Sequence, residues 1–128
     1  DEARLRAEYA GSAEFLGRVA DEQLAALYAS CRALIVPNVE EFGITAVEAQ
    51  ASGRPVIAAD EGGARETVIE GQTGFFFPRG DAAALARILR SGALDQLRPA
   101  DAVRSSQRFS VQRFQDGIRR HVALARAE

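Results

Sequence analysis

Short apolar runs alternate with helical patterns through the first part of the chain. Continuous apolar runs, which indicate strands, occur at residues 14–17, 33–37, 55–59 and 74–77. The intervening segments place apolar residues on one helical face. Strands without polar alternation, joined by helices, are typical of a parallel sheet covered on both faces. The pattern therefore predicts an α/β fold: a Rossmann-like parallel sheet with flanking helices.

After residue 81 only helical patterns remain, and they predict a C-terminal helical tail. Asp21, Asp81 and Ser110 are good N-cap residues for three of the predicted helices. There is no internal repeat or low-complexity linker. The first twelve residues resemble a helix already under way. We therefore expect residues 1–128 to form a single domain that is incomplete at its N-terminal side.

Composition and charge exclude several classes of function. The net charge is −2, from 16 Lys and Arg against 18 Asp and Glu, which argues against a nucleic-acid partner. No apolar run approaches the roughly 20 residues of a membrane span, and no signal-peptide pattern is visible, so we expect a cytoplasmic location. Cys31 is the single cysteine, and His121 has no ligand residues at suitable spacing. We expect neither a disulfide nor a metal site.

The segment from Pro37 to Gly63 holds the candidate chemistry. A buried strand ends at Pro37, and Gly43 precedes a helix that starts near Ile44. The free N–H groups and the positive dipole end of such a helix form an anion site. In an open parallel sheet this turn lies at the carboxyl edge of the strands, where ligands bind. The sequence therefore predicts a phosphate site here.

Two carboxylates flank this helix start. Glu40 precedes the turn, and Glu48 lies one helical turn after Ile44 on the same face. A carboxylate beside a phosphate is unfavourable unless it has another purpose, such as accepting hydrogen bonds from sugar hydroxyls. From spacing alone, Glu48 could equally be a solvated surface residue, and Glu40 and Glu41 could simply solvate a loop.

The pair Glu40 and Glu48, separated by seven residues with Phe42-Gly43 between them, resembles the E-x(7)-E region of glycosyltransferase family four, also called group 1, of GT-B fold. The flanking segments "AEFLGRVADEQLAALYASCRALIVPN" and "GRPVIAADEGGARETVIEGQTGFFFPRGD" are similar to those of the family. The resemblance covers roughly residues 4–91 and is weaker at "FSVQRF". Asn38 and Glu41 depart from the Ser and Gly that are usual in the family.

The resemblance implies a role for each matched position. Glu40 would approach the donor-sugar hydroxyls as the catalytic residue, and Glu48 would hold the ribose. The backbone of Phe42, Gly43 and Ile44 would meet the diphosphate, and the loop Gly17-Arg18-Val19 would lie against the base. Two alternatives stay open at the edges of this site. Gly62-Gly63 could contact the ligand or only form a turn, and the side chains of Arg18 and Arg65 are better interpreted as solvated surface.

The resemblance also implies a function. It indicates retaining transfer of a hexose from a GDP- or UDP-linked donor, without metal or other cofactor, to an acceptor such as a polysaccharide or lipid-linked glycan. The family's acceptor domain and diphosphate-binding basic pair lie upstream of the matched region, so we expect this chain alone to be inactive. Any peripheral membrane contact would come through that acceptor domain. A non-catalytic nucleotide-binding module and part of a GT-B-like nucleotide-sugar epimerase remain as alternatives.

Overall fold

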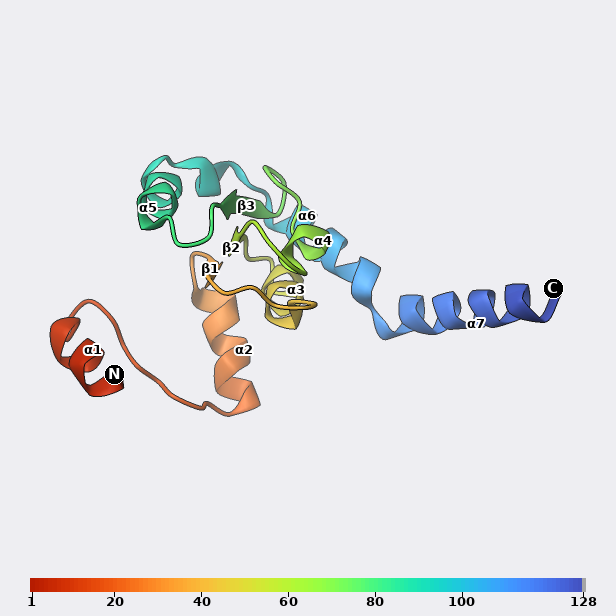
Figure 1. The fold of residues 1–128 in the computed structure, drawn as a ribbon, viewed down its shortest axis with the longest axis horizontal. Helices are drawn as coiled ribbons and strands as arrows, with labels where there is room; N and C mark the ends of the chain where they lie inside the picture. Colours follow the sequence, from red (N-terminus) through yellow and green to blue (C-terminus); the bar gives the residue numbers. More distant parts are fainter. Residues whose placement is uncertain (128) are drawn as a thin grey trace.

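The computed structural model describes residues 1–127, and its centre is a three-stranded parallel sheet (Figure 1). The strands stand in the order β1-β2-β3, and Ile57 of the middle strand is in register with Ile35 and Phe75. Three of the four predicted strands and the α/β class are therefore confirmed. The strands are β1 (Leu34–Val36), β2 (Val56–Ala59) and β3 (Gly74–Phe77).

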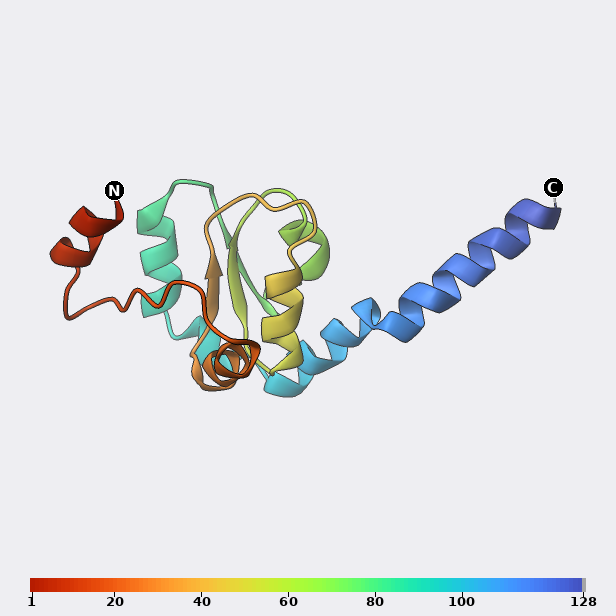
Figure 2. The ribbon, with the colours of Figure 1, turned by 90° about the horizontal axis from the view of Figure 1, so that it is seen from below.

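Helices cover both faces of the sheet, as the unbroken apolar strands predict (Figure 2). The helices are α1 (Glu2–Glu8), α2 (Asp21–Ser30), α3 (Ile44–Ala51), α4 (Ala64–Thr67), α5 (Ala82–Arg90), α6 (Pro99–Ser106) and α7 (Val111–Ala127), with 3-10 turns η1 (Ala93–Gln96) and η2 (Gln107–Phe109). All four residues of β2 are buried. Val56 and Ala58 pack with α2 and α3 on one face, while Ile57 and Ala59 pack with α5 and η1 on the other.

Residues 14–17 do not form the predicted strand. They run as irregular chain between an isolated bridge, Ala10 to Ala13, and the start of α2. An apolar run becomes a strand only when its N–H and C=O groups find a partner strand, and none of the three described strands pairs with residues 14–17. Phe15 instead lies beneath the Arg6 guanidinium, 5.2 Å from its carbon to the ring centre.

The predicted caps are confirmed at two helices and wrong at one. The Asp81 carboxylate accepts from the Ala84 N–H at 2.9 Å, and the Ser110 hydroxyl accepts from the Arg113 N–H at 3.2 Å. At α2 the N-cap is Ala20, without a side-chain bond, and Asp21 is the first helical residue. The Asp21 carboxylate still lies in the first turn, where the helix dipole favours negative charge.

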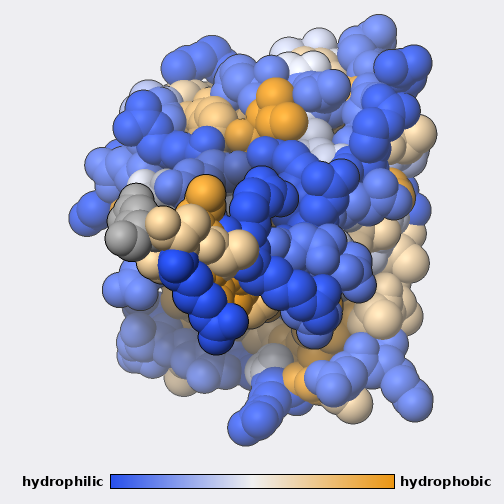
Figure 3. Space-filling model, turned by 90° about the vertical axis from the view of Figure 1, so that its right-hand side faces the viewer, coloured by the Kyte–Doolittle hydropathy of each residue, from blue (hydrophilic) through white to orange (hydrophobic). Residues whose placement is uncertain are grey.

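Helix α7 extends away from the rest of the molecule (Figures 1 and 2) and buries none of its residues. Viewed from the α7 end, the surface is mainly hydrophilic with small apolar patches (Figure 3). Val111, Phe114 and Ile118 contribute to the exposed apolar surface of this helix. None of the described helices is long and apolar enough to cross a bilayer.

Candidate functional site

Two loops pack tightly at the carboxyl edge of the sheet. Residues 37–43 follow β1 and residues 60–63 follow β2, and the Gly63 N–H donates to the Glu40 carbonyl at 2.7 Å. A Cβ at Gly62 would lie 2.6 Å from the Glu40 carbonyl oxygen, and one at Gly63 would lie 2.5 Å from that of Phe42. The packing of the loops thus requires both glycines, which gives the Gly62-Gly63 pair a structural role.

The start of α3 faces the Glu40 carboxylate. Gly43 has φ +82°, a left-handed conformation that favours glycine. The position that a Cβ would take on Gly43 is 3.8 Å from Glu40 Oε2, 3.7 Å from Thr67 Oγ1 and 3.9 Å from the Ala64 nitrogen. As in every α-helix, the first N–H groups have no acceptor within the helix. The starts of α3 and α4 and the Glu40 carboxylate therefore lie next to one another.

Helix α3 presents Ile44 and Glu48 to solvent because its other face is fixed. Ala46, Ala49 and Gln50 are at most 1% exposed, and Gln50 Nε2 donates to the Thr67 carbonyl at 2.8 Å. That bond ties α3 to α4. The predicted i, i+4 relation of Ile44 and Glu48 holds, since both side chains lie on the exposed side of the helix.

The Glu48 carboxylate is paired with a phenol from α2. Tyr28 Oη donates to Glu48 Oε2 at 3.0 Å. Burial, and then the hydrogen bond to Glu48 and the charge of Glu48, raise the pKa of Tyr28 to about 12. The phenol is therefore a protonated donor at neutral pH. Glu40 Oε2 lies 3.8 Å from the Cβ position of Gly43, the N-cap of the same helix that carries Glu48.

A groove of about 430 Å³ runs between α2 and α3 next to this pair, lined by Asp21, Leu24, Tyr28 and Glu48 among others. The sequence pattern predicted neither this groove nor a polar role for Tyr28. One signal was available, because a buried tyrosine hydroxyl usually has a hydrogen-bond partner.

The loop Gly17-Arg18-Val19 leads toward the groove rather than to the start of α3. Asp21 stands two residues beyond Val19 and lines the groove. Gly17 has φ +62°, and a Cβ there would meet no atom within 4 Å. The side chain of Arg18 is exposed, as predicted.

The side chains of Phe42 and Arg65 contact other protein residues, which argues against a direct role of either side chain in ligand binding. The Phe42 ring packs edge-to-face on Phe109, with ring centres 5.6 Å apart. Only the backbone of Phe42 is then left for the predicted role. Arg65 pairs with Asp60 at 3.2 Å on the surface, and both side chains are half-exposed or more. The prediction that the Arg65 side chain is solvated is confirmed.

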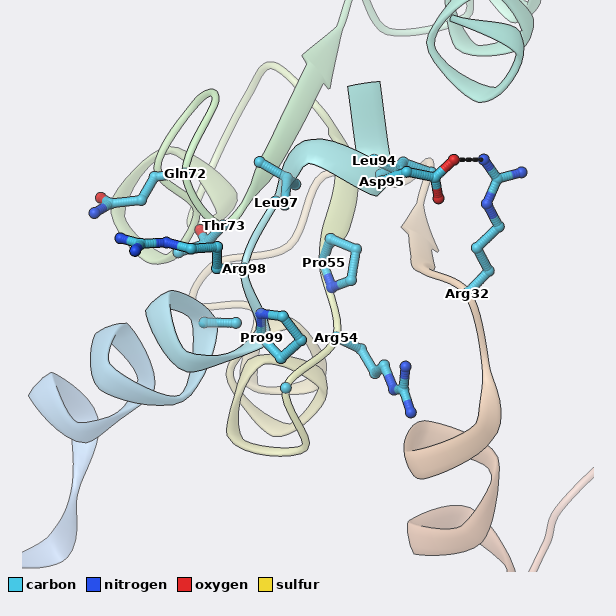
Figure 4. Close-up of a pocket in the computed structure, with 12 residues that line it drawn as sticks. Arg32, Arg54, Pro55, Gln72, Thr73, Leu94, Asp95, Leu97, Arg98 and Pro99 are labelled. Carbon is cyan, nitrogen blue, oxygen red and sulfur yellow. Dashed lines mark hydrogen bonds and ion pairs between the residues drawn. The ribbon is translucent and has the colours of Figure 1, made fainter. Parts of the chain in front are cut away.

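A second cavity, of about 210 Å³, lies at the opposite, amino edge of the sheet (Figure 4). Its three arginines point in different directions. Arg32 pairs with Asp95 at 3.5 Å, Arg98 pairs with Asp101 at 3.1 Å, and Arg54 donates to the Ala29 carbonyl. The contacts of Arg32 and Arg54 connect neighbouring elements, that of Arg98 is local to the start of α6, and the three side chains form no common anion site. Ligands of open parallel sheets bind at the carboxyl edge, so the functional site is assigned there.

Within residues 1–127, no group of three or more His, Cys, Asp or Glu side chains is arranged to hold a metal ion. The site chemistry visible in the described residues is that of two carboxylates, a phenol and backbone N–H groups.

Comparison with known proteins identifies relatives of the chain. The family model "Glycosyl transferases group 1" matches residues 3–109. D-inositol 3-phosphate glycosyltransferase of Streptomyces avermitilis is 42% identical over 93 residues, which are 72% of this chain and 20% of that protein. Phosphatidyl-myo-inositol mannosyltransferase of Mycobacterium leprae is 43% identical over 94 residues, 70% of this chain and 25% of that protein. The chain thus spans a fifth to a quarter of the length of these relatives.

Solved structures agree with these matches. Sucrose-phosphate synthase of Thermosynechococcus elongatus superposes with a TM-score of 0.76 and 30% identity, over 97% of this chain and 34% of that one. HepE of Anabaena, solved in complex with UDP and glucose, superposes with a TM-score of 0.77 and 30% identity. The match covers 95% of this chain and 35% of HepE. The predicted GT-B resemblance is confirmed, and the chain belongs to the glycosyl transferases group 1 family.

Proposed function

We propose that this chain binds the nucleotide-diphospho-sugar donor of a retaining group 1 glycosyltransferase. The observation that carries the proposal is the placement of the Glu40 carboxylate beside the N-cap of α3, the helix that also carries Glu48. HepE, a structural relative, has been solved with UDP-glucose. The site thus offers N–H donors for an anion and carboxylate acceptors for hydroxyl groups.

The diphosphate binds at the start of α3 in this proposal. The backbone N–H groups there carry about half a positive charge in total, and Gly43 allows the chain to turn without a Cβ next to the ligand. Glu40 accepts hydrogen bonds from the hydroxyls of the donor sugar. Glu48 holds the ribose, and the loop 17–19 lies against the base, at the start of α2 where Asp21 lines the groove.

The bound donor then transfers a hexose, with retention, to an acceptor such as a polysaccharide or lipid-linked glycan. Glu40 and Glu48 add negative charge close to a leaving group that itself becomes negative, and transition states of this kind need preorganised cations. We propose that these cations and the acceptor site come from outside residues 1–128. A metal-free reaction and a cytoplasmic location remain predictions from the sequence.

Calorimetry with UDP and GDP tests the donor site. A hydrogen bond to a charged group contributes about 1.5–3 kcal/mol, so Glu48→Gln should weaken binding of the preferred nucleotide about 10- to 100-fold. Glu8→Gln, which removes the same charge from exposed α1, should bind like the unmodified chain. Equal affinity of the Glu48→Gln and unmodified chains would reject the ribose role.

The proposal also predicts that the 128-residue chain does not transfer sugar by itself. Holding two reactants in line can supply roughly 7–11 kcal/mol of a barrier, and here only one reactant has a proposed site. The measurement is release of nucleoside diphosphate and formation of glycoside after incubation with UDP- and GDP-hexoses. Robust transfer by the isolated chain would show that the cations and the acceptor site lie within these residues.

A further inference from the structure

Tyr28 links the packed core to an exposed side chain, Glu48. Its ring is 8% exposed and belongs to the core cluster with Val36 and Ala49, so the backbone and packing of α2 fix the position of its hydroxyl. Glu48 is an exposed side chain on α3. A glutamate in that position samples several rotamers unless a partner restricts it. The 3.0 Å bond from Tyr28 Oη to Glu48 Oε2 is such a restriction.

The geometry leaves Glu48 free to bind a ligand while it is held. A carboxylate has two oxygens with about four lone-pair sites in total. Tyr28 occupies one site on Oε2, and Oε1 accepts from none of the described residues 1–127. A pair of neighbouring hydroxyls, as on a ribose, needs two such acceptor sites. The carboxylate is therefore restrained without being saturated.

The hydroxyl of Tyr28 is not needed to fill the core. The ring supplies the apolar contacts with Val36 and Ala49, and phenylalanine would supply the same ones. What the hydroxyl adds is a donor at the wall of the groove, between the loop that ends at Asp21 and the Glu48 side chain. This is the feature that packing alone leaves unexplained.

We propose that Tyr28 is a positioning residue for donor recognition, one that orients the Glu48 carboxylate toward the two ribose hydroxyls. The inference rests on the proposed role of Glu48 as the ribose ligand. It adds a second residue, on another helix, that acts through Glu48 and does not touch the transferred sugar. Discrimination between ribose and deoxyribose nucleotides should then depend on Tyr28.

Nucleotide affinities test this proposal. Calorimetry with UDP and GDP should show about 3- to 10-fold weaker binding by Tyr28→Phe, less than the loss expected on removing the direct ligand. For the 2′,3′-dideoxy forms of the same nucleotides, Tyr28→Phe and the unmodified chain should bind equally. In a Glu48→Ala background, Tyr28→Phe should have no further effect on either ligand.

A spectroscopic readout separates positioning from a merely structural role. The chain has two tyrosines and no tryptophan, so Tyr9→Phe leaves Tyr28 as the single phenol. With tyrosine isotope-labelled at its ζ carbon, the NMR signal should move when UDP or GDP binds, and should move less with the dideoxy forms. Tyr9→Phe is also the matched control for affinity, because it removes a hydroxyl from an exposed ring.

The outcomes distinguish the two proposals. If Glu48→Gln weakens ribonucleotide binding while Tyr28→Phe leaves the affinity and the ribose preference unchanged, the positioning role is wrong and the donor site stands. If ribose and dideoxy nucleotides bind equally to the unmodified chain, the ribose role of Glu48 fails, and the role of Tyr28 fails with it. If the NMR signal of Tyr28 did not move when a nucleotide binds, the positioning role would also be wrong.

Discussion

The sheet unit from β1 to α6 and the terminal helix α7 bury very different amounts of surface. In the sheet unit all of β2 is buried, and the loops 37–43 and 60–63 approach so closely that only glycine fits between them. Helix α7 is seventeen residues long and buries none of them (Figure 2). Packing is what stabilises most helices in proteins. Tertiary contacts therefore stabilise the sheet unit, whereas α7 depends on the hydrogen bonds and helix propensity of its own residues.

The largest predicted contrast comes from one substitution made in both regions. Gly63→Ala places a Cβ about 2.5 Å from the Phe42 carbonyl oxygen, so the two loops must separate, and unfolding free energy should fall by about 3 kcal/mol. Gly117→Ala on α7 meets no atom within 4 Å and should favour the helix by about 1 kcal/mol. Urea unfolding measures the first effect, and helical circular dichroism measures the second.

If Gly63→Ala left the unfolding free energy unchanged, the loops would have room to adjust, and the contrast between the two regions would be wrong. It would also be wrong if Gly117→Ala changed the main unfolding transition as strongly as it changed helix content. That result would couple α7 to the folding of the sheet unit.

Alkaline pH should reveal the Tyr28–Glu48 contact inside the sheet unit. The pKa of Tyr28 is raised from 10.0 to about 12, first by burial and then by its bond to Glu48. The folded state thus holds this proton more tightly than the unfolded state. The resulting stabilisation is present below pH 10 and is lost as pH rises through 12, and it amounts to at most about 3 kcal/mol.

Urea unfolding of the unmodified chain and of Tyr28→Phe on both sides of this range measures the effect. Relative to Tyr28→Phe, the unmodified chain should lose stability between pH 10 and 12. Tyr9→Phe should follow the unmodified chain. A constant difference between the Tyr28→Phe and unmodified chains across this range would show that the phenol is not protected in the folded state.

Much of the sheet unit could be predicted from the sequence because its strands are short, apolar and separated by helical patterns. The prediction was wrong at residues 14–17, where apolar character was present but no partner strand was. Strand formation depends on pairing between distant segments, and a local window does not contain that information.

The candidate site was predictable where its residues are close together in the sequence. Gly43 and Glu48 belong to one helix, so their relation follows from helix geometry, and Glu40 stands only three residues before Gly43. Tyr28 is twenty residues from Glu48, and its contact depends on how α2 packs beside α3. The same is true of Phe109, which lies 67 residues after its partner Phe42 in the sequence. Contacts of this kind follow from packing, which the local pattern does not specify.

The smallest predicted effect tests where the two regions meet. Phe42 belongs to the site loop, and Phe109 stands immediately before the segment that leads into α7, with the Arg108 guanidinium 4.8 Å from its ring centre. An edge-to-face pair contributes about 0.5–1.5 kcal/mol beyond its buried area, and the Phe42 side is nearly half exposed. A double-mutant cycle with Phe42→Leu and Phe109→Leu should therefore give a coupling of about 0.5 kcal/mol in unfolding free energy. Both single variants should also weaken UDP or GDP binding slightly and to the same extent, because each releases the same loop. If the losses in unfolding free energy are additive, the site loop holds its shape without Phe109. Phe109 would then belong with the independent helix α7 and not with the packed sheet unit.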